Sequence, residues 1–273
     1  MTAATLTRPL IVARRDMDAV AIHAVARGEV AIYSHRSPAK DSDSEDGAAV
    51  IPVDDQRAVL AVADGLGGQP SGAEAADLAL KTLAECVRAP AAEDQVLRTA
   101  VLDGFERANT RVGELAVGAA TTLAVVEIEN ATIRPYHVGD SMILVVGQRA
   151  KMKLQTVSHS PVGYAVEAGM IDEKEAIHHE DRHLVSNIVG TAEMRIEVGR
   201  TLDLRRRDTL VLGSDGLFDN LHLEEITEYV RKGPLARAAE SLAAACRRRM
   251  CEPRADHPSK PDDLTFLLYR RRE

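Results

Sequence analysis

The sequence predicts an α+β fold, namely a four-layer αββα sandwich of two antiparallel sheets flanked by helix pairs. Short apolar runs bounded by turn residues recur along the whole chain, whereas helical periodicity is confined to paired runs. Strands of this kind bury one face against a second sheet, and amphipathic helices cover the outer faces. Because no linker divides the 273 residues, we expect residues 1–273 to form a single domain.

The composition restricts the partners and the compartment. A net charge of -8 argues against nucleic acid, which needs a basic face, and favours a protein or a small molecule as partner. No apolar run approaches the roughly 20 residues of a membrane helix, and no signal-peptide core precedes Arg14-Arg15. Cys86, Cys246 and Cys251 form no CxxC pair, which favours reduced thiols. We therefore expect a soluble cytoplasmic protein that contacts no membrane.

The first third of the chain should supply strands and then a helix pair. Val30–Tyr33 and Ala48–Val53 read as strands around the polar loop Ser34–Gly47. A helix ending before Pro90 and a second helix from about Glu93 to Val117 should pack as an antiparallel hairpin against a sheet. Their apolar stripes are Ala76, Leu80, Leu83 and Val87 in the first, and Leu97, Val101, Phe105, Ala108, Val112 and Leu115 in the second.

The middle of the chain should be a three-stranded meander followed by a long loop. Thr121–Ile128, Thr132–Val138 and Met142–Val146 are expected to pair antiparallel in sequence order, with His137 as an ordinary strand residue. Residues 158–190 are long, polar and mixed, as functional lids often are. The acids and histidines at 178–183 have no spacing suited to one helix face, so we assign them no metal chemistry.

The last third returns to strands and helices. Thr209–Gly213 reads as a strand, and Glu224–Lys232 as a short helix. A final helix starts at Gly233-Pro234 and carries three arginines near its C-terminal end, where the helix dipole favours cations. Leu264–Tyr269 closes the chain as a strand.

Carboxylates occur at one end of each of four apolar strands. The strand at Leu60–Ala63 stops at Asp64, before a glycine-rich turn, and the pattern returns at Asp215-Gly216 and at Asp140. Asp262-Asp263 precedes the last strand instead of following one. A single Asp-Gly pair is most often an ordinary turn, but four such ends can converge if their strands are neighbours. Clustered carboxylates suit hard divalent cations.

Seven segments follow one another along the chain, namely SEDGA, VADGLGG, TTLAVV, HVGDS, HSPVGYAVEAGMIDEKEA, LVLGSDGLFDN and DDLTFLL. Together and in this order, they resemble the metal-dependent protein phosphatase family, the type 2C serine/threonine phosphatases, in its compact bacterial form. The resemblance runs from about Ser34 to the C-terminus. Residues 1–30 are then a poorly matched N-terminal extension, and residues 158–190 a flap-like insert.

The resemblance implies a centre of two Mn²⁺ or Mg²⁺ ions, and possibly a third. Asp64 bridges the two ions, Asp215 and Asp262 complete one site, and Asp46 or Glu45 with the Gly65 carbonyl completes the other. A third, weaker site would use Asp140, Asp215 and Asp219. By analogy with the family, the two cations acidify a bridging water that attacks phosphoserine or phosphothreonine, with Asp64, Asp215 and Asp262 as the catalytic carboxylates.

The sequence departs from the family at three positions. The phosphate-binding Arg of the family falls on Asp41, so we expect Lys40 to replace it, with Arg36 as the competitor. Met142 stands where GDSR has its Arg, which should loosen that turn. Leu66 replaces the His of animal-type DGHGG, which leaves protonation of the leaving group to a metal-bound water.

Two functions remain open at this point. The first is an active phosphatase whose substrate is a phosphorylated protein, such as a Ser/Thr kinase or its targets. The second is a pseudophosphatase that keeps the fold and serves as a regulatory binding module. Intact Asp64, Asp215 and Asp262 favour the first, and the replaced arginines keep the second under consideration.

Overall fold

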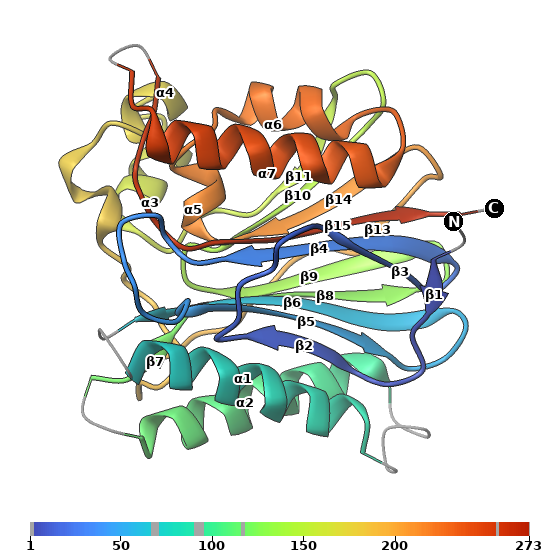
Figure 1. Ribbon diagram of the computed structural model, residues 1–273. Coiled ribbons are helices and arrows are strands. Elements are labelled where there is room, and N and C mark those ends of the chain that lie inside the picture. The colour runs from blue at the N-terminus through green and yellow to red at the C-terminus, as the bar shows by residue number, and fades with distance from the viewer. Residues whose placement is uncertain (1–2, 67–70, 90–95, 116–117, 255–256, 273) are drawn as a thin grey trace.

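The computed structural model describes residues 3–66, 71–89, 96–115, 118–254 and 257–272, and these form four layers. Two sheets stack face to face, with one helix pair below them and another above them (Figure 1). The predicted αββα sandwich is confirmed. Among the described residues, none of the helices combines the length and the apolar character needed to cross a membrane.

The eight-stranded sheet has the order β12-β9-β8-β6-β5-β2, with β13 also paired to β9 and β7 to β6. All of its pairings are antiparallel. Its strands are β2 (Leu10–Ala13), β5 (Asp46–Pro52), β6 (Arg57–Leu66), β7 (Ala120–Thr121), β8 (Leu123–Glu129), β9 (Thr132–Val138), β12 (Glu197–Val198) and β13 (Leu202–Asp203).

The seven-stranded sheet has the order β1-β3-β4-β15-β14-β10-β11. It is antiparallel except for the short β1–β3 pair, which is parallel. Its strands are β1 (Ala4–Thr5), β3 (Ala21–Val25), β4 (Gly28–His35), β10 (Met142–Val146), β11 (Met152–Gln155), β14 (Thr209–Gly213) and β15 (Leu264–Arg271).

The helices cover the outer faces of the sandwich and one of its ends. In Figure 1, α1 and α2 lie under the eight-stranded sheet, α6 and α7 lie over the seven-stranded sheet, and α3 and α4 lie at one end of the sandwich. Their bounds are α1 Ser71–Val87, α2 Leu97–Gly113, α3 Pro161–Glu167, α4 Glu173–Ala176, α5 Asp215–Phe218, α6 Leu223–Val230 and α7 Leu235–Cys251, with a 3-10 turn, η2, at Glu180–His183. The ends predicted for the second helix, residues 93–95 and 116–117, fall outside the described residues.

Three apolar layers hold the sandwich together, and β6 shows how the sequence builds them. Val59, Ala61 and Ala63 pack toward α1 and α2. The alternate residues Leu60 and Val62 pack between the two sheets. Because side chains of a strand alternate between faces, one apolar strand supplies two layers. The third layer lies between the seven-stranded sheet and the helices α6 and α7.

The predicted three-stranded meander is wrong in its third strand. β8 pairs with β9, but β10 pairs with β14 and β11 in the other sheet. Gly139 has φ +107, and a side chain there would meet Thr122 at 2.6 Å, so only glycine suits this turn. The chain crosses between the sheets here, which places Asp140 at the end of the sandwich.

Residues before Gly28 contribute to both sheets. β2 forms the edge of one sheet beside β5, and β3 pairs with β4 in the other. The apolar run at Val20–Val25, whose period is ambiguous in the sequence, is thus mostly strand.

Candidate metal centre

Strand register brings the predicted acids to one end of the sandwich. Asp46 at the start of β5 lies directly opposite Asp64 near the end of β6. In the other sheet, Gly213 at the end of β14 pairs with Met142 at the start of β10 and with Phe266 near the start of β15. The residues just beyond these ends are Asp140, Asp215, Asp262 and Asp263. The four strand-end acids predicted from sequence therefore do converge.

Two threonines hold the backbone of Asp64 in place. The Asp64 N–H donates to Thr122 Oγ1 at 3.0 Å, and the Thr122 N–H donates to the Asp64 carbonyl at 2.8 Å. Thr121 Oγ1 also donates to that carbonyl at 2.9 Å. Thr122 Oγ1 lies 2.7 Å from Ser141 Oγ in the turn that carries Asp140. The TT and GDS segments thus fix the position of Asp64 relative to Asp140.

Asp46 is held from the opposite sheet. Ser214 Oγ donates to Asp46 Oδ2 at 2.6 Å, and the Thr265 N–H lies 3.2 Å from the same Ser214 oxygen. Thr265 Oγ1 in turn lies 2.8 Å from Ser34 Oγ. These buried hydroxyls tie β5 to β14, β15 and β4, so the carboxylates of the two sheets are locked together.

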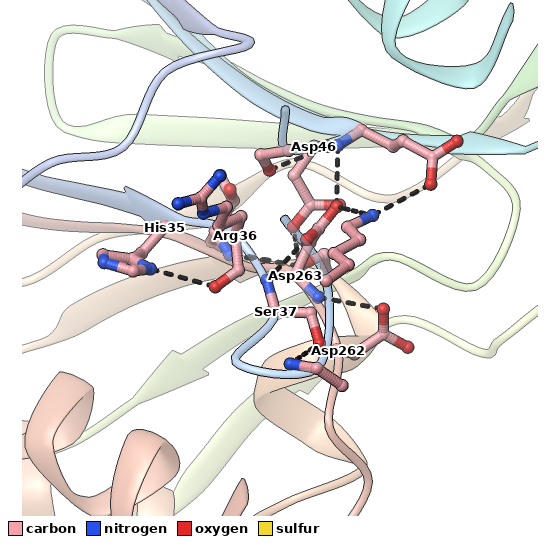
Figure 2. A network of polar contacts seen from close by, with 12 residues as sticks. His35, Arg36, Ser37, Asp46, Asp262 and Asp263 are labelled. Atoms are coloured by element: carbon pink, nitrogen blue, oxygen red, sulfur yellow. Dashed lines mark hydrogen bonds and ion pairs between the residues drawn. The ribbon is translucent and has the colours of Figure 1, made fainter. Parts of the chain in front are cut away.

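Asp263 organises the loop before Asp46, a role that the sequence did not reveal. Figure 2 shows Asp263 at the centre of a polar network that also includes Ser37, Asp46 and Asp262. Its two carboxylate oxygens accept the Ser37 and Glu45 N–H groups, each at 2.7 Å. The Lys40 ammonium lies 2.7 Å from Asp263 Oδ2 and 2.9 Å from Glu45 Oε2. The signal available in the sequence was the doubled Asp262-Asp263.

Arg36 takes a different direction from Lys40. Its guanidinium lies 3.2 Å from Asp16 Oδ2 and donates to the Asp41 carbonyl at 2.6 Å. Figure 2 draws Arg36 beside His35, away from Asp262. Of the two cations considered from sequence, Lys40 is the one in contact with the acid cluster.

Close backbone packing explains the glycines that follow two of the acids. A Cβ on Gly65 would lie 2.1 Å from the Gly72 carbonyl oxygen, and a Cβ on Gly216 would lie 1.8 Å from the Asp263 carbonyl oxygen. Real Cβ atoms cannot approach so closely. The glycines of the Asp-Gly pairs therefore allow the backbone of α1 and of the segment before β15 to pack close to the acids. These pairs do more than form ordinary turns.

Burial and mutual repulsion dominate the electrostatics. Burial, and then the charge of Asp46, raise the pKa of Asp64 well above its ordinary value. The pKa of Asp46 is raised by burial and by Asp263, against a lowering by the Ser214 hydrogen bond. Burial and Asp215 raise the pKa of Asp140 to about 7. Ionising all of these carboxyls in the folded chain therefore costs free energy that bound cations would offset.

The donor set fits hard divalent cations. The carboxylates at this end offer oxygen ligands, and Glu45 Oε1 is buried with no hydrogen-bond partner among the residues that the structure describes. Asp215, Asp219 and Asp262 surround the ammonium of Lys260, another residue that the sequence did not single out. Of the acids and histidines at 178–183, His178 and His179 lie in the turn between α4 and η2, and the others lie on η2. His178, His179, Glu180 and His183 are exposed.

A cavity of about 460 Å³ lies beside the acids, between the 158–190 segment and α6. Asp140 and Asp219 line it together with apolar residues that include Met142 and Ile177. Arg182 approaches from this segment, with its Nε 3.8 Å from Asp219 Oδ2. The side chain of Met142 thus contributes apolar wall, while the turn before it stays anchored through Ser141.

A second group of polar side chains lies behind the Asp140 turn. His137, His159 and Glu197 offer donor atoms within 4.8 Å of one another, which is close enough for a metal ion. His159 Nδ1, however, accepts the Gly139 N–H at 3.1 Å and lies 2.9 Å from Asn187 Nδ2. Backbone bonds to Arg195 fix the orientation of the Asn187 amide, with Nδ2 as the donor.

These hydrogen bonds place the proton of neutral His159 on Nε2, which lies 3.1 Å from Glu197 Oε2. A metal-binding histidine normally donates through its other ring nitrogen, and His159 cannot do so. Burial, and then His159, lower the pKa of His137. The group is therefore better described as a buried polar bridge that supports the Gly139 turn than as a metal site.

Comparison with known proteins identifies the family to which the chain belongs. The sequence profile described as Protein phosphatase 2C matches residues 34–249. The serine/threonine phosphatase stp of Listeria innocua is 25% identical over 238 residues, which cover 84% of this chain and 90% of that protein.

Solved structures share the fold. A serine/threonine phosphatase of S. agalactiae superposes with a TM-score of 0.75 at 24% identity, over 90% of this chain and all of that one. The catalytic domain of the phosphatase PstP, solved in complex with two manganese ions, gives a TM-score of 0.68 at 24% identity, over 88% of this chain and 96% of that one.

Proposed function

Because this chain belongs to the protein phosphatase 2C family, we propose that it hydrolyses phosphoserine and phosphothreonine in proteins with two bound divalent cations, Mn²⁺ or Mg²⁺. The observation that carries the proposal is the convergence of Asp46, Asp64, Asp215 and Asp262 at one end of the sandwich. A PstP structure that contains two manganese ions has the same fold and supports this choice of cofactor.

The proposed ligand assignment is the one that the family resemblance implies. Asp64, Asp215 and Asp262 would hold one ion, and Asp64, the Gly65 carbonyl and Asp46 or Glu45 would hold the other. When bound, the ions supply positive charge that acidifies a water molecule and neutralises the phosphoryl oxygens. Ser214 orients the Asp46 carboxylate and Thr122 holds the Asp64 backbone before any ion arrives, which lowers the cost of assembling the site.

The substrate would enter over the acids, beside residues 158–190. We propose that this segment is a flap. We also propose that residues 1–273 act as one domain, because the N-terminal 30 residues supply β2 to one sheet and β3 to the other. A phosphorylated protein, such as a Ser/Thr kinase or one of its targets, is the proposed partner. The protein is proposed to work in the cytoplasm.

Hydrolysis of p-nitrophenyl phosphate with added Mn²⁺ tests the proposal. An active phosphatase releases nitrophenol in a metal-dependent manner, and the release stops when EDTA removes the ions. A pseudophosphatase that serves as a binding module would leave the ester intact at every Mn²⁺ concentration. That result, obtained with folded protein, would replace the proposed function by the alternative.

Lys40 is proposed to hold the substrate phosphate. Burial lowers the pKa of this amine, but hydrogen bonds to Asp263 and Glu45 outweigh burial and raise it, so the group is a permanent cation. Lys40→Ala should raise KM for a phosphopeptide about 10-fold, the worth of one charge-assisted contact, with a smaller change in kcat. Steady-state kinetics on the variant measure this split.

Arg36→Ala is the matched control, because Arg36 is engaged with Asp16 and Asp41 instead of the acid cluster. Its KM should stay within about 2-fold of the parent value, as expected for a surface charge. If neither variant raises KM, the phosphate is held without Lys40 and this assignment fails.

A further inference from the structure

The ammonium group of Lys260 lies inside the acid cluster. Its Nζ is 2.5 Å from Asp215 Oδ2 and 3.0 Å from both Asp219 Oδ2 and Asp262 Oδ2. The side chain is only 23% exposed. One cation therefore contacts three carboxylates that come from two separate parts of the chain.

The backbone of Lys260 is held in position by a buried asparagine. The Lys260 N–H donates to Asn220 Oδ1, and Asn220 Nδ2 donates to the Lys260 carbonyl, both at 2.9 Å. Asn220 Nδ2 also donates to the Gly216 carbonyl at 2.9 Å. The lysine is thus fixed to α5, the helix that begins with Asp215, and the placement of its ammonium is built into the fold.

The carboxylates around Lys260 overlap with those of the weaker cation position expected from the family. Asp215 and Asp219 would hold a third ion together with Asp140. An ammonium supplies one positive charge and three N–H donors to such oxygens, but it cannot act as a Lewis acid. A divalent ion at this position has to displace the lysine from two of its three partners.

We propose that Lys260 takes the place of the third divalent cation in this chain, so that the protein binds two ions where its acids could hold three. The inference rests on the proposed function, because it presumes that Asp64 and its neighbours bind the first two ions. The ammonium of Lys260 permanently neutralises part of the negative charge of Asp215, Asp219 and Asp262. The positive charge at this position therefore does not depend on the metal concentration.

Binding of Mn²⁺ alone to the full chain tests this, by isothermal titration and by metal analysis after gel filtration. Lys260→Met removes the charge while keeping a long side chain, and we expect the number of bound ions to rise from two to three per chain. Lys260→Arg keeps the charge and should stay at two. Adding Asp140→Ala to Lys260→Met should remove the gained ion and leave the first two.

Thermal unfolding gives a second readout that does not depend on turnover. In EDTA, Lys260→Met should melt several degrees below the parent chain, because three acids lose their counter-ion, and Mn²⁺ should restore the loss. Lys153→Met is the control, since Lys153 pairs with Asp208 at 2.6 Å. Any loss it causes should persist when Mn²⁺ is added.

The outcomes separate the two proposals. A parent chain that binds no Mn²⁺ would overturn the proposed function and this inference together. A parent chain that binds three ions, or a Lys260→Met chain that still binds two with unchanged affinity, would overturn the role of Lys260 while leaving the phosphatase assignment in place.

Discussion

Asp64→Ala is expected to lose about 10³-fold or more of the metal-dependent turnover, since both proposed ions share this carboxylate. Asp64 lies opposite Asp46, and its pKa is also raised by the charges of Asp215 and Asp140. Asp64 is therefore close to acids from both sheets. Turnover of p-nitrophenyl phosphate across a Mn²⁺ titration measures the loss, and calorimetry should show weaker or absent Mn²⁺ binding.

The same variant should not lose stability in the absence of metal. The pKa of Asp64 in the folded chain lies above its ordinary value, so above the unfolded pKa the folded state loses stability as pH rises and the group ionises. Removing the carboxyl relieves that cost at neutral pH. In EDTA, urea unfolding of Asp64→Ala should therefore give a free energy equal to or above that of the parent.

Asp77→Ala provides the control, because Asp77 pairs with Lys81 on the surface of α1, away from the strand-end acids. Its turnover and Mn²⁺ binding should match those of the parent. Unchanged Mn²⁺ stoichiometry in Asp64→Ala would contradict the bridging role.

Much of the architecture could be predicted from the sequence because local patterns determine it. The continuous apolar run of β6 indicates a strand buried on both faces, and the 3.6-residue stripe of α1 indicates a helix and its buried face. The sheet to which β10 belongs could not be predicted in this way. Its apolar residues satisfy either sheet, and the crossing depends on the contact of Gly139 with Thr122, residues 17 positions apart.

The acids were predictable for a similar reason, whereas their organising partners were not. Asp64 and Asp215 follow apolar runs, so the local sequence predicts their position at the end of a sheet. Asp263 and Lys260 act through contacts over long sequence separations. Asp263 binds Ser37 across 226 positions, and Lys260 binds Asp215 across 45. The sequence alone does not distinguish a lysine that contacts several acids, such as Lys260, from a solvent-exposed lysine in a surface loop.

The glycines of the Asp-Gly pairs belong to a local sequence pattern and also make contacts over a long sequence separation. Gly216→Ala tests the importance of such a contact. A Cβ at this position would lie 1.8 Å from the Asp263 carbonyl oxygen and 3.4 Å from Leu264 Cα. Both neighbours are backbone atoms of the segment that enters β15, so no side-chain rotation relieves the clash. Either α5 or the start of β15 has to move.

Gly216→Ala should therefore lower the free energy of unfolding by about 3 kcal/mol, the upper part of the usual range for overpacking, as measured by urea denaturation. Gly147→Ala is the matched control, because the nearest atom to its Cβ is the flexible Lys153 Cε at 3.2 Å, and it should change stability by less than about 1 kcal/mol. Since the displaced segment carries Asp262 and Asp263, the fraction of Gly216→Ala that remains folded should also bind Mn²⁺ more weakly. A variant as stable as the parent, with undiminished Mn²⁺ affinity, would show that the contact between α5 and β15 is not what sets the spacing of these acids.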